Sequence, residues 1–167
     1  MKNRRGYSFV ELMIVVLIMG ILAAAAAPKF TAALDNNRAD GAARRIAADL
    51  NRLRAEAMIT SSSSKPSVTF DADSEVYGFS GLADPDHPSR AYKVSLSSTS
   101  YPADIVAAKF LDSDNDVETT LKYDLYGRPW CGSDEERLVD GSISVSSGDV
   151  VRSVVIDPVT GAARVAD

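Results

Sequence analysis

Apolar residues dominate the start of the chain before a spaced pattern replaces them. The run from Leu12 to Ala27 contains no charged residue, and Glu11 is the only side chain between Tyr7 and Ala27 that is charged at neutral pH. At about 1.5 Å per helical residue this stretch spans roughly 31 Å, the thickness of a membrane hydrocarbon core. The pattern therefore predicts a transmembrane helix over residues 7–28.

After Pro28, which can bend a helix without ending it, apolar residues recur at the three- and four-residue spacing of one helix face. They are Ala39, Ala42, Ala43, Ile46, Ala47, Leu50, Leu53, Ala57 and Met58. The intervening arginines lie off this stripe and are expected to form a solvated face: Arg38, Arg44, Arg45, Arg52 and Arg54. We therefore expect one long helix from about Tyr7 to Thr60, whose second half packs on a globular head.

From Lys65 onward the pattern changes to strands and turns. Strand candidates are residues 67–70, 75–79, 91–96, 105–111, 119–125, 142–146, 150–156 and 162–165. A helix followed by antiparallel strands is an α+β arrangement, here a long helix packed on an antiparallel β-sheet head. The expected organisation is a membrane helix over 7–28, an amphipathic helix and serine-rich loop over 29–64, and a β-rich head over 65–167.

Glu11 is a carboxylate at the entrance of the membrane segment. A charge deep in a bilayer costs about 2.5 to 3.5 kcal/mol, so such a group normally has a functional partner. The partner should be cationic, and because the segment offers no cation on the same face, it should come from another chain. A secretory signal cut near Pro28, or a plain uncleaved anchor, would also explain the basic start and the apolar run. Neither of these has a use for the carboxylate.

The residues around Glu11 resemble a known signal. Arg5-Gly6-Tyr7-Ser8-Phe9-Val10-Glu11, followed by the apolar run, is similar to the class III signal of type IV prepilins and type II secretion pseudopilins. The resemblance implies that a prepilin peptidase cuts after Gly6, which makes residues 1–6 a leader, and that Tyr7 becomes the methylated N-terminus. It also implies that Glu11 faces the N-terminal ammonium of a neighbouring pilin or pseudopilin during assembly.

Two further stretches narrow the resemblance. Residues 53–57, with Arg54 and Glu56, resemble a short signature of the minor H-type pseudopilins and FimT-like minor pilins, as does the ending over 141–161. The pilin-like resemblance implies a minor pseudopilin of a type II secretion pseudopilus, which supports protein export across the outer membrane. The alternative is a FimT-like minor type IV pilin that serves pilus assembly or DNA uptake.

Charge and orientation limit the partners. The chain has 18 Lys and Arg against 23 Asp and Glu; cleavage after Gly6 would leave 15 against 23, a net charge of −8. An acidic chain is a poor general ligand for phosphate backbones, and Arg152 and Arg164 are the only cations of the C-terminal segment, so nucleic acid is an unexpected partner. Basic residues at positions 2, 4 and 5 predict a cytoplasmic N-terminus and an exported head. The resemblance implies that the membrane is the inner membrane and that the head is periplasmic.

Residues with catalytic or metal-binding chemistry form no complete set. Asp112, Asp114 and Asp116 have the alternation of a calcium loop, but the glycine and the closing glutamate of that loop are missing, so an acidic surface loop is expected. His87 is the only histidine and is expected at the surface. Cys131 is the only cysteine and is expected to be buried or half-buried. The sequence therefore predicts no cofactor and no enzymatic activity.

Overall fold

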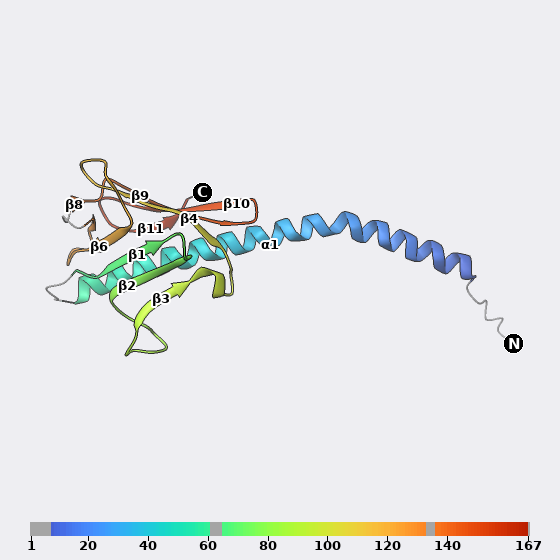
Figure 1. Cartoon of the computed structure of the whole chain (residues 1–167), viewed down its shortest axis with the longest axis horizontal. Helices are drawn as coiled ribbons and strands as arrows, with labels where there is room; N and C mark the ends of the chain where they lie inside the picture. The colour runs from blue at the N-terminus through green and yellow to red at the C-terminus, as the bar shows by residue number, and fades with distance from the viewer. Residues whose placement is uncertain (1–7, 61–64, 133–135, 167) are drawn as a thin grey trace. The chain divides into compact units, whose positions relative to one another are not determined.

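The computed structural model describes residues 8–60, 65–132 and 136–166 (Figure 1). The predicted cleavage junction between Gly6 and Tyr7 and the predicted loop at 61–64 lie outside these ranges. The chain divides into two compact units, Met1–Leu34 and Asp35–Asp167. The second unit is called the head below.

One long helix, α1 (Phe9–Ile59), contributes to both units and confirms the continuous helix expected from the sequence. Pro28 lies inside this helix and does not end it. A proline removes one backbone donor from the helix, and nearby the Thr31 hydroxyl donates to the Pro28 carbonyl at 2.9 Å.

Within the head, α1 buries the predicted apolar stripe. All members from Ala39 to Ala57 are buried, whereas Met58 is 51 % exposed and so departs from the expectation. Met58 lies in the last turn of the helix, where its sulfur lies close to Gly127 instead of entering the core. The stripe confirms that helical periodicity selects the core-facing side, except at this last turn.

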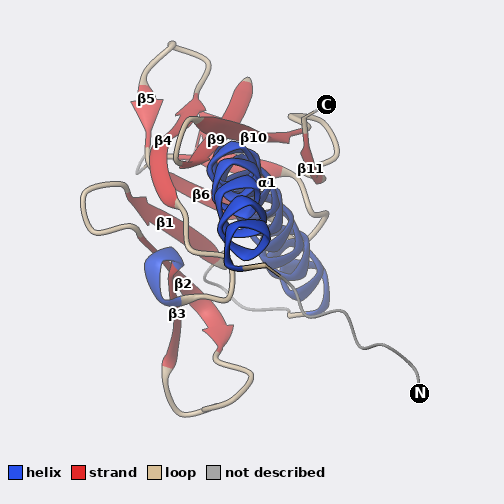
Figure 2. Ribbon diagram, turned by 90° about the vertical axis from the view of Figure 1, so that its right-hand side faces the viewer, coloured by secondary structure: helices blue, strands red, loops and turns tan. Residues whose placement is uncertain are grey.

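The strands form two antiparallel sheets, where the sequence suggested one. The first sheet has the order β3-β2-β1-β6-β7-β8 and the second the order β11-β10-β9-β4-β5. The elements are β1 (Ser67–Asp71), β2 (Val76–Ala83), β3 (Ala91–Ser95), the 3-10 helix η1 (Leu96–Ser98), β4 (Asp104–Leu111), β5 (Val117–Glu118), β6 (Thr120–Tyr123), β7 (Pro129–Cys131), β8 (Glu136–Arg137), β9 (Asp140–Ser147), β10 (Val150–Ile156) and β11 (Ala163–Val165). In Figure 2 the head segment of α1 lies against strands of both sheets, and the buried core joins all three layers.

Most predicted strands are confirmed, and one is corrected. The expected strand over 119–125 is shorter, because Thr120–Tyr123 pairs with β1 in the first sheet and Asp124 then closes a turn. The Asp124 carboxylate accepts from the backbone N–H groups of Tyr126 and Arg128, each at 2.9 Å. This side-chain capping of a turn competes with strand pairing and places Leu125 outside the sheet. Strands β5, β7 and β8, each two or three residues long, were not predicted.

Two polar side chains fasten α1 to the sheets. Asp49 accepts hydrogen bonds from the hydroxyls of Tyr77, at 2.7 Å, and Tyr92, at 3.2 Å, in the first sheet. Asn51 exchanges two hydrogen bonds with the backbone of Ala163 in the second sheet, at 2.8 and 3.1 Å. Burial, and after it the Asp49 charge, raises the pKa of Tyr77, so its hydroxyl remains a donor at every physiological pH.

Candidate assembly site

The first turns of α1 present a fully apolar surface. Every large apolar side chain from Phe9 to Leu22 is at least 50 % exposed, and the helix is long and apolar enough to cross a membrane. Exposed apolar surface on this scale normally marks contact with lipid or with another protein. The surface of this segment is therefore suited to contact with lipid or with another protein.

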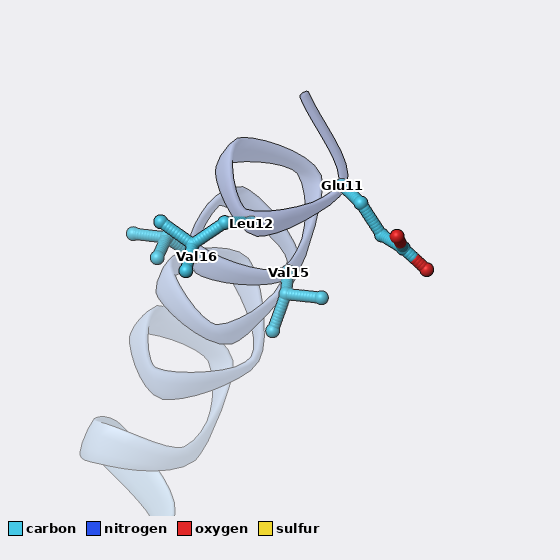
Figure 3. Close-up of a pocket in the computed structure, with 4 residues that line it drawn as sticks. All are labelled: Glu11, Leu12, Val15 and Val16. Carbon is cyan, nitrogen blue, oxygen red and sulfur yellow. The ribbon is translucent and has the colours of Figure 1, made fainter. Parts of the chain in front are cut away.

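Glu11 interrupts this surface from the first turn of α1 (Figure 3). Its carboxylate points away from the helix on the side that also carries Val15, whereas Leu12 and Val16 point to the other side. The four side chains border an apolar hollow of about 340 Å³. The i, i+4 spacing places Glu11 and Val15 on one face, a neighbour that the sequence analysis did not single out although the spacing identifies it.

No cation neutralises Glu11 within the part of the chain that the structure describes. The ion pairs of that part join other residues, and the described residues between Glu11 and Lys29 include no Lys or Arg. The positive end of the helix dipole favours a carboxylate in the first turn, by about 0.3 to 1 kcal/mol. This is less than the cost of placing the charge in lipid, so the helix dipole alone does not offset that cost.

A carboxylate on an apolar helix can recognise a cationic group that arrives on an equally apolar partner. The Coulomb attraction between the two groups is strong in a medium of low dielectric constant, and ions dissolved in water do not compete for either group there. Formation of such a pair is favoured, because each partner alone would carry an unpaired charge in an apolar medium. The geometry therefore suits helix-to-helix recognition.

The chain carries a prokaryotic N-terminal methylation motif over residues 1–27. The match spans Gly6, Tyr7 and Glu11 and supports a type IV pilin-like protein. The motif implies processing by a prepilin peptidase and assembly with other pilins, and with the apolar helix it indicates membrane anchoring. It favours a structural role over an enzymatic one. No curated protein and no solved structure matches the chain.

The stretch around Arg54 and Glu56, at the end of α1, has a structural task. Arg54 is half-buried and its Nε donates to the Gly127 carbonyl at 3.2 Å, so it leaves the solvated face on which it was expected. The Glu56 carboxylate accepts from the Thr60 hydroxyl at 2.9 Å at the end of α1. The other four arginines of that face are exposed, as predicted: Arg38, Arg44, Arg45 and Arg52.

The acidic loop after β4 organises itself through its own backbone. Asp112 is 8 % exposed, and its Oδ1 accepts from the backbone N–H groups of Asp114, at 3.0 Å, and Asp116, at 2.8 Å. Among the described residues, no three His, Cys, Asp or Glu side chains are grouped so that they could hold a metal ion. Asp112 therefore acts as a cap that shapes the loop.

The remaining reactive residues lie where the sequence placed them. His87 is exposed in the loop between β2 and β3, and its backbone N–H donates to Asp84 at 3.3 Å. Cys131 is 1 % exposed in β7 and borders a cavity of about 80 Å³. Burial, and after it the charges of Asp112, Glu118 and Glu136, raises the pKa of the Cys131 thiol to about 11.

We expect Cys131 to react with maleimide at pH 8 at least about 100-fold more slowly in the native chain than in urea. With a pKa of about 11 the thiolate is scarce at pH 8, whereas an unfolded thiol ionises near pH 8.5. The native rate should therefore keep rising with pH up to about 11, after the unfolded rate has levelled off. The measurement is mass-detected labelling of the single cysteine; equal native and unfolded rates would contradict the raised pKa.

Proposed function

We propose that this chain is a minor pseudopilin of a type II secretion pseudopilus, which enters the filament through its N-terminal helix and supports protein export across the outer membrane. The peptidase would cut between Gly6 and Tyr7 and methylate Tyr7. The new ammonium of each subunit would then meet the Glu11 carboxylate of a neighbour. The head would remain on the periplasmic side of the inner membrane until the helix is extracted into the fibre.

The observation that carries this proposal is the position of Glu11. It stands on an otherwise apolar, exposed helix with no cation among the described residues to neutralise it. A secretory signal or a plain anchor gains nothing from such a carboxylate, whereas a subunit that is held until a matching ammonium arrives requires it. The methylation motif over residues 1–27 supports the same processing event.

A FimT-like minor pilin for pilus assembly or DNA uptake is the alternative that shares this N-terminus. The C-terminal segment gives that alternative little support, because Arg152 is tied to α1 through Asn36, at 3.1 Å, and Asp40, at 3.9 Å. Arg164 alone remains on the last strand as an exposed cation among the described residues 163–166. We therefore place the secretion role first.

The proposed processing is tested by N-terminal mass analysis of the chain expressed with and without a prepilin peptidase. We expect the peptidase to remove residues 1–6 completely and to leave a chain that begins at a Tyr7 heavier by one methyl group. A bulky substitution, Gly6→Leu, should leave the precursor uncut, whereas Ser8→Ala serves as a matched control that is cut normally. A mature chain that begins near Ala27 or Pro28 would overturn the proposal in favour of a secretory signal.

A further inference from the structure

The outward side of the first sheet collects positive charge on an acidic protein. Residues of this sheet alternate between the core and the outside, as strand geometry requires. Lys122 on β6, Trp130 on β7 and Arg137 on β8 are direct cross-strand neighbours on the outward side. Lys93 on β3 stands on the same side, opposite Gly78. We call Lys93, Lys122 and Arg137 the basic face.

The basic face is held in place by its neighbours. The Arg137 guanidinium lies 5.7 Å from the centre of the Trp130 ring, and the Lys65 ammonium lies 4.6 Å from it. The outward positions between the cations are mainly small or hydroxyl-bearing, and the Thr69 and Thr120 hydroxyls lie 3.1 Å apart. A flat surface of cations and hydroxyls suits carboxylates, and the cations beside Trp130 occupy the ring that a sugar or a base would stack on.

The acids of this sheet do not neutralise the basic face. In its six strands, all of them described, the acids are Asp71 and Glu136. Asp71 stands at the end of β1 and accepts from the backbone of Asp73 and Ser74 in its own turn. Glu136 pairs with the core-facing Cys131, so it leaves β8 on the side opposite to Arg137.

That opposite side carries a matching negative surface. Asp114, Asp116, Glu118 and Glu136 border the cavity of about 80 Å³ beside Cys131, and we call these four residues the acidic rim. Asp114 and Asp116 are exposed, and Ser113 donates to the Glu136 carboxylate. The two residues of β8 thus belong to different surfaces: Arg137 belongs to the basic face and Glu136 to the acidic rim.

We propose that the basic face of one copy of this chain binds the acidic rim of a second copy. The two surfaces are complementary in charge and lie on opposite sides of β8. Each copy that is added therefore still has one basic face or one acidic rim available for a further copy. Such a head-to-tail contact builds open linear assemblies in place of closed dimers. This inference rests on the proposed function in one respect only: the proposed filament is where such contacts between heads would occur.

The experiment measures self-association of the full chain in detergent micelles by sedimentation velocity, at about 0.05 M and about 0.5 M salt. We expect stronger association at low salt, although the chain's net charge of −5 makes whole copies repel. The same salt dependence is expected in a Glu11→Ala background, because the contact is between heads. Loss of association with Glu11→Ala would assign it to the helix and overturn the head contact without affecting the proposed function.

Three matched variants locate the contact. The face variant, Lys122→Glu with Arg137→Glu, and the rim variant, Asp114→Lys with Asp116→Lys, should each weaken association at low salt by at least about tenfold. Asp112 is left intact because it caps the acidic loop. The control, Arg90→Glu with Lys109→Glu, changes the net charge as much as the face variant at two exposed positions outside the face, and should associate within about twofold of the native chain.

Mixing supplies the decisive observation. The rim variant keeps a basic face and gains two lysines, and the face variant keeps an acidic rim and gains two glutamates, so an equal mixture should associate at low salt although neither variant does so alone. This result also excludes misfolding as the reason for the single-variant losses. Native-like association of either variant, failure of the mixture to pair, or binding of single-stranded DNA to Lys122 and Arg137 without self-association would overturn the proposal.

Discussion

Glu11→Ala should reduce recovery of the chain in sheared filaments by at least about tenfold while leaving cleavage after Gly6 intact. The substitution removes a carboxylate from an exposed apolar helix on which no described residue neutralises it. Membrane insertion should become slightly more favourable, because a costly charge is removed from the lipid. Incorporation should fail, because the neighbour's ammonium then has no partner when it leaves water. The measurement compares immunoblots of sheared filaments and membranes from the same cells.

Two matched variants separate charge from shape. Glu11→Gln keeps the size and a carbonyl oxygen that accepts hydrogen bonds but loses the charge, so it should fall close to Glu11→Ala. Val15→Ala removes apolar volume from the same helix face, one turn further on, and should assemble nearly normally. If Glu11→Gln entered filaments as well as the native chain, the carboxylate would not be the recognition group and the pairing model would be wrong.

Gly161→Ala should lower the free energy of unfolding of the head by about 3 to 5 kcal/mol. Gly161 has a φ of 74°, a region that costs other residues about 1 to 2 kcal/mol. A Cβ at this position would lie 2.3 Å from the Gly127 carbonyl oxygen and 2.9 Å from the Tyr123 ring. Backbone and a buried ring cannot move aside cheaply, and the Tyr123 hydroxyl also donates to the Gly161 carbonyl at 3.1 Å.

Gly148→Ala is the matched control, with an expected loss of about 1 to 2 kcal/mol. Gly148 has a φ of 55° in the turn between β9 and β10, so the backbone cost is similar. Its added Cβ would meet only the Asp35 carboxylate, at 2.7 Å, which is the end of a flexible side chain. Urea denaturation followed by fluorescence of the single tryptophan, Trp130, measures both variants; equal losses would contradict the backbone clash at Gly161.

Periodic patterns were the best guide to the fold. The apolar run to Ala27 and the stripe from Ala39 to Ala57 predicted one helix, because a helix repeats its faces every three to four residues whatever surrounds it. The strands predicted over 142–146 and 150–156 likewise correspond to β9 and β10, which pair as a hairpin. Strands β5, β7 and β8 offer too few positions for a period to show and were missed, although β11, as short as β7, was predicted over 162–165.

Single residues of the candidate assembly site and of the head also differ in whether the local sequence is enough to identify their role. Glu11 stands out in sequence because a charge in an apolar run is a local anomaly. Arg54 was expected on the solvated face with the other arginines, because its contact with Gly127 joins residues far apart along the chain. The Asp112 loop was ambiguous for a related reason, since a spacing of acids cannot tell ion ligands from carboxylates that accept from their own backbone.

By itself, the sequence determined the long apolar helix, the place of Glu11 on it and the α+β class, because each follows from the order of neighbouring residues. Only the tertiary structure decided that there are two sheets, and that Lys93, Lys122 and Arg137 share one outward side. These cations are widely separated in the chain, and cross-strand register is what brings them together. A net charge of −5 describes the whole molecule, whereas recognition depends on where folding places each charge.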